Sequence, residues 1–236
     1  MSMRLFITGS SGFIGTELIK HLSKKKKFEI VKYDLKEGKD ILNYEQLKEA
    51  MKGCDFVIYL AAIRGPYEDK TFEDYFRVNC IGTFNVAQAA LENKIKRFIF
   101  TGSTSYYGVE RGIPFPKPIK ESNSVITQHL KADDLNCRDC DVAYSTSKVI
   151  AEQILANYGL RKKFEVIILR FGPIGGKLGE KWELDGVTLK VENAIQALEL
   201  AITTNKKLWY EAFTITDDVP NVDLTKAKEI LGYNPI

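Results

Sequence analysis

The chain has 236 residues, 44% of them hydrophobic and 28% charged, and a formal net charge of +3. The length suits one α/β domain and the composition is ordinary for a globular protein. A charge this small gives no reason to expect nucleic acid as a partner, and no apolar run approaches the length of a membrane span.

No signal peptide is predicted, because the apolar run RLFITG is short and leads into glycines rather than a cleavage site. Four cysteines in a chain of this length do not make a disulfide scaffold. Cys54 and Cys80 stand in apolar segments and are predicted core residues. Cys137 and Cys140 form C-x-x-C without a second pair or a histidine at zinc spacing. We expect no metal site and a cytoplasmic location.

Apolar, β-branched runs alternate with segments of helical period along the chain. The apolar runs predict strands at 4–8, 28–34, 55–62, 97–102 and 164–170. The segments of helical period predict helices at 15–25, 44–53, 72–93 and 143–159. Nearly continuous hydrophobic strands separated by helices indicate a parallel sheet that is covered on both faces. The predicted fold class is therefore α/β, a doubly wound parallel sheet.

Two irregular stretches interrupt this alternation. Residues 109–142 are polar and proline-rich, and they are too long for an ordinary connection, so they are a candidate lid or substrate loop. Residues 172–186 form the second stretch, before a helix at 190–204, a strand-like LWYEAFTIT and a closing helix DLTKAKEILG. We expect a main domain over 1–171 and a short C-terminal region over 172–236.

The segment FITGSSGFIG joins the first strand to the first helix. Gly9, Gly12 and Gly15 permit a tight turn, close approach of the backbone to a pyrophosphate, and tight packing of the helix on the sheet. Asp34 ends the second strand nineteen residues after Gly15, where an acid accepts the ribose hydroxyls of adenosine and repels a 2′-phosphate. The sequence therefore predicts a dinucleotide site of the NAD-binding Rossmann kind, with NAD favoured over NADP.

The segment CDVAYSTSKVIAEQIL places Tyr144 and Lys148 four residues apart, one turn along the same helix face. A free phenol has a pKa near ~10 and is a poor base at neutral pH. A neighbouring ammonium and a cationic nicotinamide both favour the phenolate. Such a phenolate can take the proton from a secondary alcohol whose carbon gives hydride to the nicotinamide.

These motifs resemble the extended short-chain dehydrogenases/reductases of the NAD-dependent epimerase/dehydratase family. The matching pieces follow in order over essentially the whole chain: TGSSGFIG, Asp34, KDI, YLAA, RVNCIGTFNVAQAA, FTGSTSYYG, YSTSK, LRFGPIGG and the tail VDLTKAKEILGYNP. The resemblance implies a catalytic trio of Ser103, Tyr144 and Lys148. Ser103 would hold the reacting hydroxyl, Tyr144 would act as base or acid, and Lys148 would bind the nicotinamide ribose.

The resemblance also implies the remaining site residues. Cofactor binding falls on Gly9, Ser11, Gly12, Phe13, Ile14, Gly15, Asp34, Asp40, Ile41, Leu60, Ala61, Ala62, Asn79, Thr101, Tyr144, Lys148, Phe171 and Pro173. Asn79 would brace the strand beside the site. Substrate contacts fall on Ser103 and Thr104. Apart from the resemblance, Arg64 follows YLAAI and should lie at the carboxyl end of the sheet, where it either meets a substrate carboxylate or phosphate or is a solvated loop arginine. Residues 1–171 would bind NAD, residues 172–236 would bind substrate, and helices 71–93 and 142–159 would form a homodimer interface.

The residues after Ser103 narrow the reaction. Dehydratases of this family carry Asp-Glu there, whereas this chain has Thr104 and Ser105, which disfavours water elimination. A non-dehydrating sugar or nucleotide-sugar epimerase is the main expectation, with His129 or Cys140 as a possible second acid. The segment after Arg170 is short and leaves little protein to bind a nucleotide diphosphate, so a dehydrogenase of a free sugar or uronic acid is an alternative. A non-catalytic NAD-binding protein is the alternative from another class.

Overall fold

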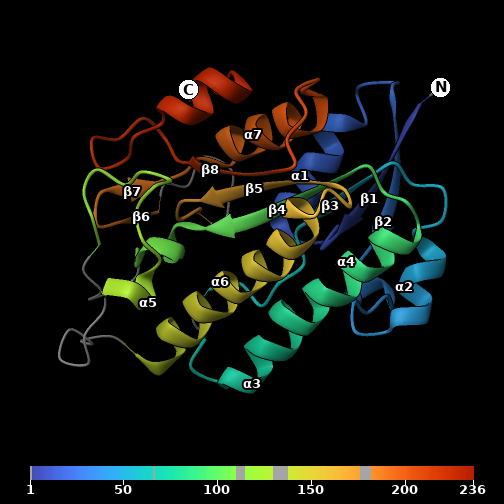
Figure 1. Ribbon diagram of the computed structural model, residues 1–236, viewed down its shortest axis with the longest axis horizontal. Coiled ribbons are helices and arrows are strands. Elements are labelled where there is room, and N and C mark those ends of the chain that lie inside the picture. The colour runs from blue at the N-terminus through green and yellow to red at the C-terminus, as the bar shows by residue number, and fades with distance from the viewer. Residues whose placement is uncertain (1, 66, 110–114, 130–137, 176–181) are drawn as a thin grey trace.

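Six parallel strands form one sheet through the middle of the molecule (Figure 1). The computed structural model describes residues 2–65, 67–109, 115–129, 138–175 and 182–236. The strands lie in the order β2-β1-β3-β4-β5-β8. Their bounds are β1 (Met3–Thr8), β2 (Phe28–Tyr33), β3 (Phe56–Tyr59), β4 (Arg97–Ser103), β5 (Glu165–Phe171) and β8 (Tyr210–Ile215). The doubly wound parallel sheet expected from the sequence is confirmed.

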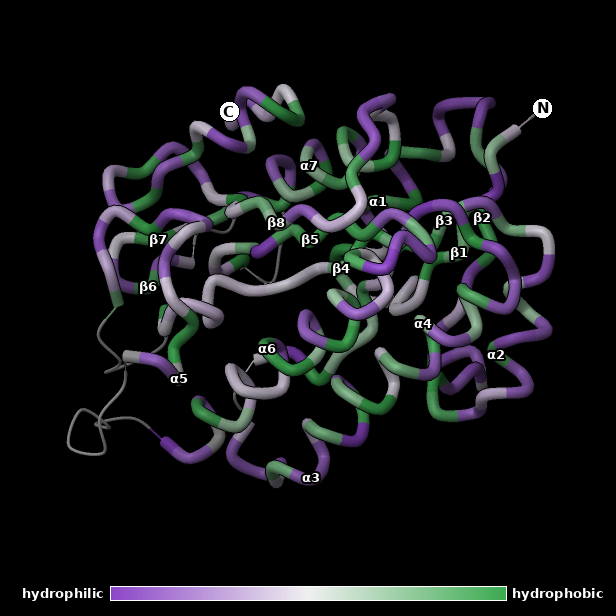
Figure 2. Tube along the Cα trace, in the orientation of Figure 1, coloured by the Kyte–Doolittle hydropathy of each residue, from purple (hydrophilic) through white to green (hydrophobic). Residues whose placement is uncertain are grey.

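Helices cover both faces of the sheet because alternate strand residues point to opposite sides. Leu5 and Ile7 pack with α1 (Phe13–Leu22) and α7 (Val191–Thr203) on one face. Phe6 packs on the other face, with α2 (Tyr44–Ala50), α4 (Gly82–Glu92) and α6 (Asp139–Leu160). Figure 2 shows hydrophilic residues along the outer turns. The strands are therefore buried on both faces, which explains their nearly unbroken apolar sequences.

The helix predicted over residues 72–93 is one helical run with a change of pitch in its middle. It consists of α3 (Phe72–Tyr75), the π-helical segment η2 (Phe76–Ile81) and α4. Thr71 caps its start: its hydroxyl accepts the Asp74 N–H at 3.2 Å, and the Asp74 carboxylate accepts the Thr71 N–H at 2.9 Å. Wider π turns are frequent at functional sites, and this one contains Asn79.

The C-terminal region belongs to the same sheet. It contributes β6 (Glu183–Leu184), β7 (Val187–Thr188), α7, β8 and η5 (Ala227–Leu231). β8 pairs with β5 along its whole length, and α7 packs against β4, β5 and β8. The division at residue 171 is thus one of proposed role, because the two parts share one sheet and one core.

Part of the long segment 109–142 is fastened to this C-terminal region. Ile119 pairs with Val222 in an isolated bridge, and the Glu121 carboxylate accepts the Thr214 N–H at 2.7 Å. The short helix α5 (Ile126–His129) follows. Residues 110–114 and 130–137 of the predicted lid lie outside the described residues.

Candidate functional site

The glycine turn after β1 is built so tightly that side chains would not fit at two of its positions. Gly9 has φ +66°, and a Cβ added there would lie 2.7 Å from the Ala61 nitrogen. A Cβ on Gly15 would lie 2.3 Å from the Gly9 carbonyl oxygen. The first N–H groups of α1, which starts at Phe13, have no intrahelical partners and suit a phosphate.

The turn lies where the strand order changes direction, since β1 has β2 on one side and β3 on the other. Ligands of doubly wound sheets bind at the carboxyl ends of the strands at such a point. Leu60 and Ala61 follow β3 there, and both donate their N–H groups to the Thr8 hydroxyl at 3.2 Å. The glycine turn after β1 and the segment after β3, which are both predicted to contact the dinucleotide, therefore lie next to each other.

Asp34 stands at the end of β2 and is tied to the same turn. One carboxylate oxygen accepts the Ser11 N–H at 2.9 Å, and the other accepts the Lys36 N–H at 2.9 Å. The side chain is half-buried. Each carboxylate oxygen has further acceptor capacity, so Asp34 can hold the glycine turn and still accept a ribose hydroxyl.

Asp34→Asn is expected to weaken NAD binding about tenfold and to raise the affinity for NADP relative to NAD. The amide oxygen can still accept the Ser11 N–H, but the charge that strengthens a ribose hydrogen bond and repels a 2′-phosphate is lost. Calorimetric titration with both cofactors measures the ratio. Glu37→Gln is the matched control, because Glu37 lies 3.4 Å from the Ser11 hydroxyl on the exposed side of the turn. An unchanged NADP-to-NAD ratio in Asp34→Asn would contradict the assignment.

Asp40 and Ile41, predicted beside the adenine, lie between β2 and α4. The Tyr33 hydroxyl donates to the Asp40 carbonyl at 2.9 Å, and the Asn85 amide donates to the Ile41 carbonyl at 3.1 Å. Ile41 fills the space over Gly82, where a Cβ would lie 2.5 Å from its Cδ1. These contacts fix the backbone of both residues, and the adenine contact itself stays a prediction.

Asn79 uses its whole side chain as a brace. Its oxygen accepts the Ile63 N–H at 2.9 Å, and its nitrogen donates to the Ile63 carbonyl at 3.2 Å and to the Ser147 hydroxyl at 2.9 Å. The side chain is buried. Asn79 therefore joins the segment after β3 to α6, and it supports the predicted cofactor site through these neighbours.

Lys148 is almost completely buried, with 4% of its surface exposed. Its ammonium donates to the Thr101 carbonyl at 2.7 Å and lies 4.6 Å above the centre of the Phe100 ring. Burial lowers the pKa of Lys148 to about 8, against the opposing charge of Glu152. The lysine is thus held at the carboxyl end of β4, one helical turn from Tyr144.

Tyr144 lies half-buried on α6, and its ring meets the edge of Tyr75 at 6.2 Å between centroids. Tyr75 is itself fixed, since its hydroxyl donates to the Gly65 carbonyl at 3.0 Å. α6 packs against β4 and against the turn η3 (Thr104–Tyr107), which begins directly after Ser103. This packing places β4 and α6, which carry the predicted catalytic residues Ser103, Tyr144 and Lys148, together at the carboxyl ends of the strands.

The residues after Ser103 form the short turn η3, which Ser103 caps. Thr104, predicted to contact substrate, lies in the tight η3 turn with 1% of its surface exposed, and its contact with substrate stays a prediction. Ser105 lies with Ser103: their hydroxyls are 2.7 Å apart, and the Ser105 N–H bonds the Ser103 hydroxyl at 3.1 Å. A serine two residues after a capping serine was the available sequence signal.

The remaining predicted positions fall around the carboxyl ends of the strands. Phe171 is buried at the end of β5, and the half-buried Pro173 accepts the Leu189 N–H at 2.9 Å. Arg64 is exposed on the loop after β3. The side chains of His129 and Cys140 and the whole of Cys137 lie outside the described residues.

Within the part of the chain that the structure describes, neither a metal cluster nor a membrane-spanning helix is found. No group of three or more His, Cys, Asp or Glu side chains there could hold a metal ion. Over the same residues, every helix is too short or too polar to cross a bilayer.

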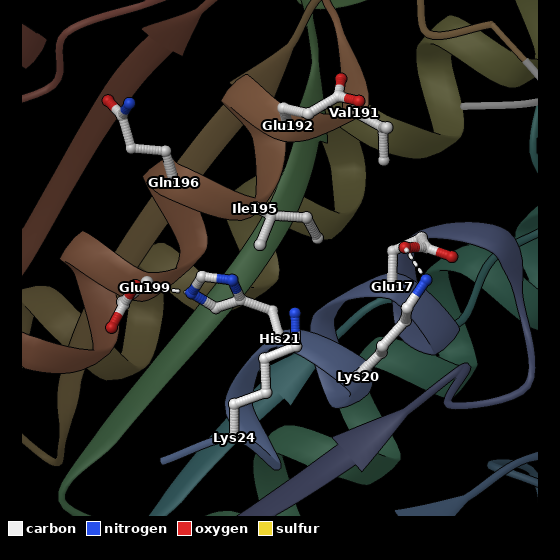
Figure 3. A pocket seen from close by; sticks show the side chains of 9 residues that line it. All are labelled: Glu17, Lys20, His21, Lys24, Val191, Glu192, Ile195, Gln196 and Glu199. Carbon is white, nitrogen blue, oxygen red and sulfur yellow. Dashed lines mark hydrogen bonds and ion pairs between the residues drawn. The ribbon is translucent and has the colours of Figure 1, made fainter. Parts of the chain in front are cut away.

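A hollow of about 420 Å³ lies between α1 and α7, on the face of the sheet opposite α6 (Figure 3). Two pairs of its side chains are in contact: His21 meets Glu199 at 2.8 Å, and Lys20 meets Glu17 at 3.7 Å. Lys25 bonds Glu199 as well. The sheet separates this groove from Tyr144 and Lys148, and we assign no site to it.

The parallel sheet, together with the site at the carboxyl ends of its strands, defines a dinucleotide-binding protein of the short-chain dehydrogenase/reductase kind. The chain belongs to the NAD dependent epimerase/dehydratase family, whose sequence pattern matches residues 5–219. The resemblance stated from the sequence is therefore confirmed, and NAD is the cofactor of the family.

Two characterised relatives show how broad this family is. The chain is 29% identical over 225 residues to a UDP-glucose 4-epimerase of Vibrio cholerae, which covers 88% of this chain and 62% of that protein. It is 28% identical over 177 residues to an L-arabinose 1-dehydrogenase (NAD(P)(+)) of Haloferax volcanii, which covers 72% of this chain and 66% of that protein. The chain thus spans slightly less than two thirds of these relatives.

Solved structures show the same fold. A UDP-glucuronic acid 4-epimerase from Bacillus cereus in complex with NAD superposes with a TM-score of 0.79, covering 99% of this chain and 92% of that chain at 19% identity. A mutated uronate dehydrogenase superposes with a TM-score of 0.75, covering 100% of this chain and 82% of that chain at 20% identity.

Proposed function

We propose that this chain binds NAD and exchanges a hydride between it and a secondary alcohol of a sugar or nucleotide sugar, as a non-dehydrating epimerase. The observation that carries the proposal is the burial of Lys148, whose ammonium donates to the Thr101 carbonyl one helical turn from Tyr144. The glycine turn lies at the same carboxyl ends of the strands. A tyrosine–lysine pair without a role would be expected to leave its ammonium in solvent, because burying an ammonium is costly.

The residues present fit the cofactor. Gly9 and Gly15 leave no room for side chains where backbone must approach a pyrophosphate, and Asp34 stands beside the turn to receive a ribose. Bound NAD would supply the hydride acceptor and donor. Tyr144 would then take the alcohol proton on its phenolate oxygen, and the Lys148 ammonium would stabilise that phenolate. Ser103, oriented by Ser105, would hold the reacting hydroxyl.

Epimerisation is favoured over dehydration by the residues at the end of β4. Elimination of water needs an acid and a base beside the reacting carbon, and here Thr104 and Ser105 are both buried and carry no ionisable group at neutral pH. The Vibrio cholerae relative is a UDP-glucose 4-epimerase, which supports a nucleotide sugar as substrate. We place the exposed Arg64 toward a substrate carboxylate or phosphate.

A dehydrogenase of a free sugar is the second candidate, supported by the Haloferax volcanii arabinose dehydrogenase. The two differ in the fate of the hydride, which an epimerase returns within one turnover and a dehydrogenase leaves on NADH. A non-catalytic NAD-binding protein is the third candidate. The intact Ser103, Tyr144 and Lys148 argue against it.

The test combines two readouts on one panel. Purified protein with excess NAD is given UDP-sugars, free uronic acids and free aldoses, while absorbance follows NADH and chromatography follows epimeric products. Interconversion of UDP-sugar epimers without net NADH supports the epimerase, and steady NADH from a free sugar supports the dehydrogenase. NAD binding without either product would support the non-catalytic alternative, and failure to bind NAD would refute the proposal.

We also propose a cytoplasmic homodimer. Four large apolar side chains, each 40–49% exposed, stand on the run from α3 to α4: Phe72, Phe76, Ile81 and Phe84. Such a stripe marks a surface for another protein, and a second copy that uses this run together with α6 would cover it. The buried free thiols of Cys54 and Cys80 fit a reducing compartment.

Phe84→Asp is expected to convert the dimer into a monomer, because a charge placed in an apolar interface has no partner there. Sedimentation velocity at micromolar protein measures the change. Leu35→Asp is the control, since Leu35 is 69% exposed in η1 (Leu35–Glu37), away from the stripe. A monomeric wild type, or a dimer in Phe84→Asp, would contradict this interface.

A further inference from the structure

A buried carboxylate lies one helical turn beyond Lys148 on α6. Glu152 exposes 0% of its surface. The Arg170 guanidinium grips it twice, with Nη2 at 2.8 Å and Nε at 3.1 Å from Oε2. Gly102, paired with Arg170 in the sheet, makes room for it, because a Cβ on Gly102 would lie 2.6 Å from Glu152 Oε1. The interior at the end of β4 is therefore shaped around this ion pair.

Arg170 also reaches the turn that follows Ser103. Its Nη1 donates to the Tyr107 hydroxyl at 2.7 Å, and its Cζ lies 3.4 Å from the centre of the Tyr106 ring. The Tyr107 hydroxyl also lies 3.1 Å from the Thr214 hydroxyl of β8. The pair thus joins α6, which carries Tyr144 and Lys148, to η3, which begins after Ser103.

A buried ion pair is weak evidence for stability, because removing two charges from water costs about as much as their attraction returns. Its position suggests another role. Burial raises the pKa of the Glu152 carboxyl, while Arg170 and Lys148 both oppose that shift and so favour the carboxylate. The charged and titratable groups that act on Lys148 are Glu152 on its own helix and the Cys80 thiol of η2, and Arg170 holds Glu152 from β5; Tyr144 stands one turn back along α6.

We propose that Glu152 and Arg170 are positioning residues whose pairing sets the charge of Lys148 and holds the Ser103 turn against α6. The carboxylate favours the ammonium form of the buried lysine. The Arg170 guanidinium forms the direct hydrogen bonds to the Glu152 carboxylate. Lys148 therefore remains available to a ligand instead of forming a direct ion pair with Glu152. This inference rests on the function proposed above for Lys148.

The test measures the protonation of Lys148 directly, by NMR titration of the full chain carrying ¹³Cε-labelled lysine. The Lys148 signal is assigned with Lys148→Arg. We expect wild type to titrate near its pKa of about 8. Glu152→Gln should lower that midpoint by about one pH unit or more, because an opposite charge is lost while Arg170 remains. Arg170→Gln should raise it, because Glu152 then faces Lys148 alone.

Glu165→Gln is the matched control. Glu165 is also buried and bonds Arg97 Nε at 2.7 Å, at the opposite end of the same two strands. It should lower thermal stability without moving the Lys148 midpoint. Shifts of the same sign in Glu152→Gln and Arg170→Gln, or no shift in either, would overturn the proposal. If Glu152→Gln does not fold, the sign in Arg170→Gln decides.

The titration needs no cofactor, so it is independent of the proposed function. NAD affinity gives the second readout. In Glu152→Gln it should fall at pH 8 and recover on lowering the pH to 6.5, as Lys148 regains its proton. Failure of wild type to bind NAD would refute the proposed function, whereas a normal NAD affinity with unshifted midpoints would refute only the positioning role.

Discussion

Tyr144→Phe should reduce turnover about 10²- to 10⁴-fold, the range expected when a general acid–base group is removed. The ring and its edge contact with Tyr75 are kept, so the fold and the NAD affinity should change little. Only the oxygen that would carry the alcohol proton is lost. Turnover is measured on whichever substrate of the panel proves active, and NAD affinity by calorimetry.

Tyr158→Phe is the matched control for this variant. Tyr158 lies on the same helix, and its hydroxyl bonds the Gln88 side chain at 3.2 Å, far along α6 from the site. It should lose a little stability and keep its turnover. If Tyr144→Phe keeps more than a tenth of wild-type turnover while folded, another group moves the proton and Tyr144 is not the base.

Gly15→Ala should lower both stability and NAD affinity strongly. The new Cβ would lie 2.3 Å from the Gly9 oxygen and 2.9 Å from the Ser10 Cα, which are backbone atoms that cannot rotate away. α1 must then move off the turn, at a cost of about 1–3 kcal/mol for such overpacking, and its N–H groups no longer point at the pyrophosphate. Thermal unfolding and NAD titration measure the two losses.

Gly12→Ala separates packing from cofactor contact within the same turn. A Cβ there would lie 3.2 Å from the Gly9 oxygen, and Gly12 has φ −75°, which an alanine adopts readily. It should fold with nearly wild-type stability and bind NAD more weakly, because its Cβ stands where the helix start meets the phosphates. A Gly15→Ala protein as stable as Gly12→Ala would contradict the packing argument.

Much of this architecture was accessible from local patterns. The strands at 4–8, 28–34, 97–102 and 164–170 lie within one or two residues of β1, β2, β4 and β5, because a strand buried on both faces must be apolar throughout. The glycine turn was recognisable from its three spaced glycines, and side chains do not fit at Gly9 and Gly15. The π-helical segment at 76–81 was missed, because the apolar pattern of a helix does not reveal one turn of wider pitch.

The sequence by itself determined the fold class, the family and the position of the Tyr144–Lys148 pair on one helix face. The fold class and the helix face follow from periodicity, which is a property of neighbours along the chain, and the family follows from the resemblance of its ordered motifs. The tertiary structure decided the rest: the burial of Lys148 on Thr101, the burial of Thr104, the hydrogen bond between Ser103 and Ser105, and the Glu152–Arg170 pair. Each depends on elements brought together by the sheet register and the packing of α6, and burial and charge compensation exist only once that packing has formed.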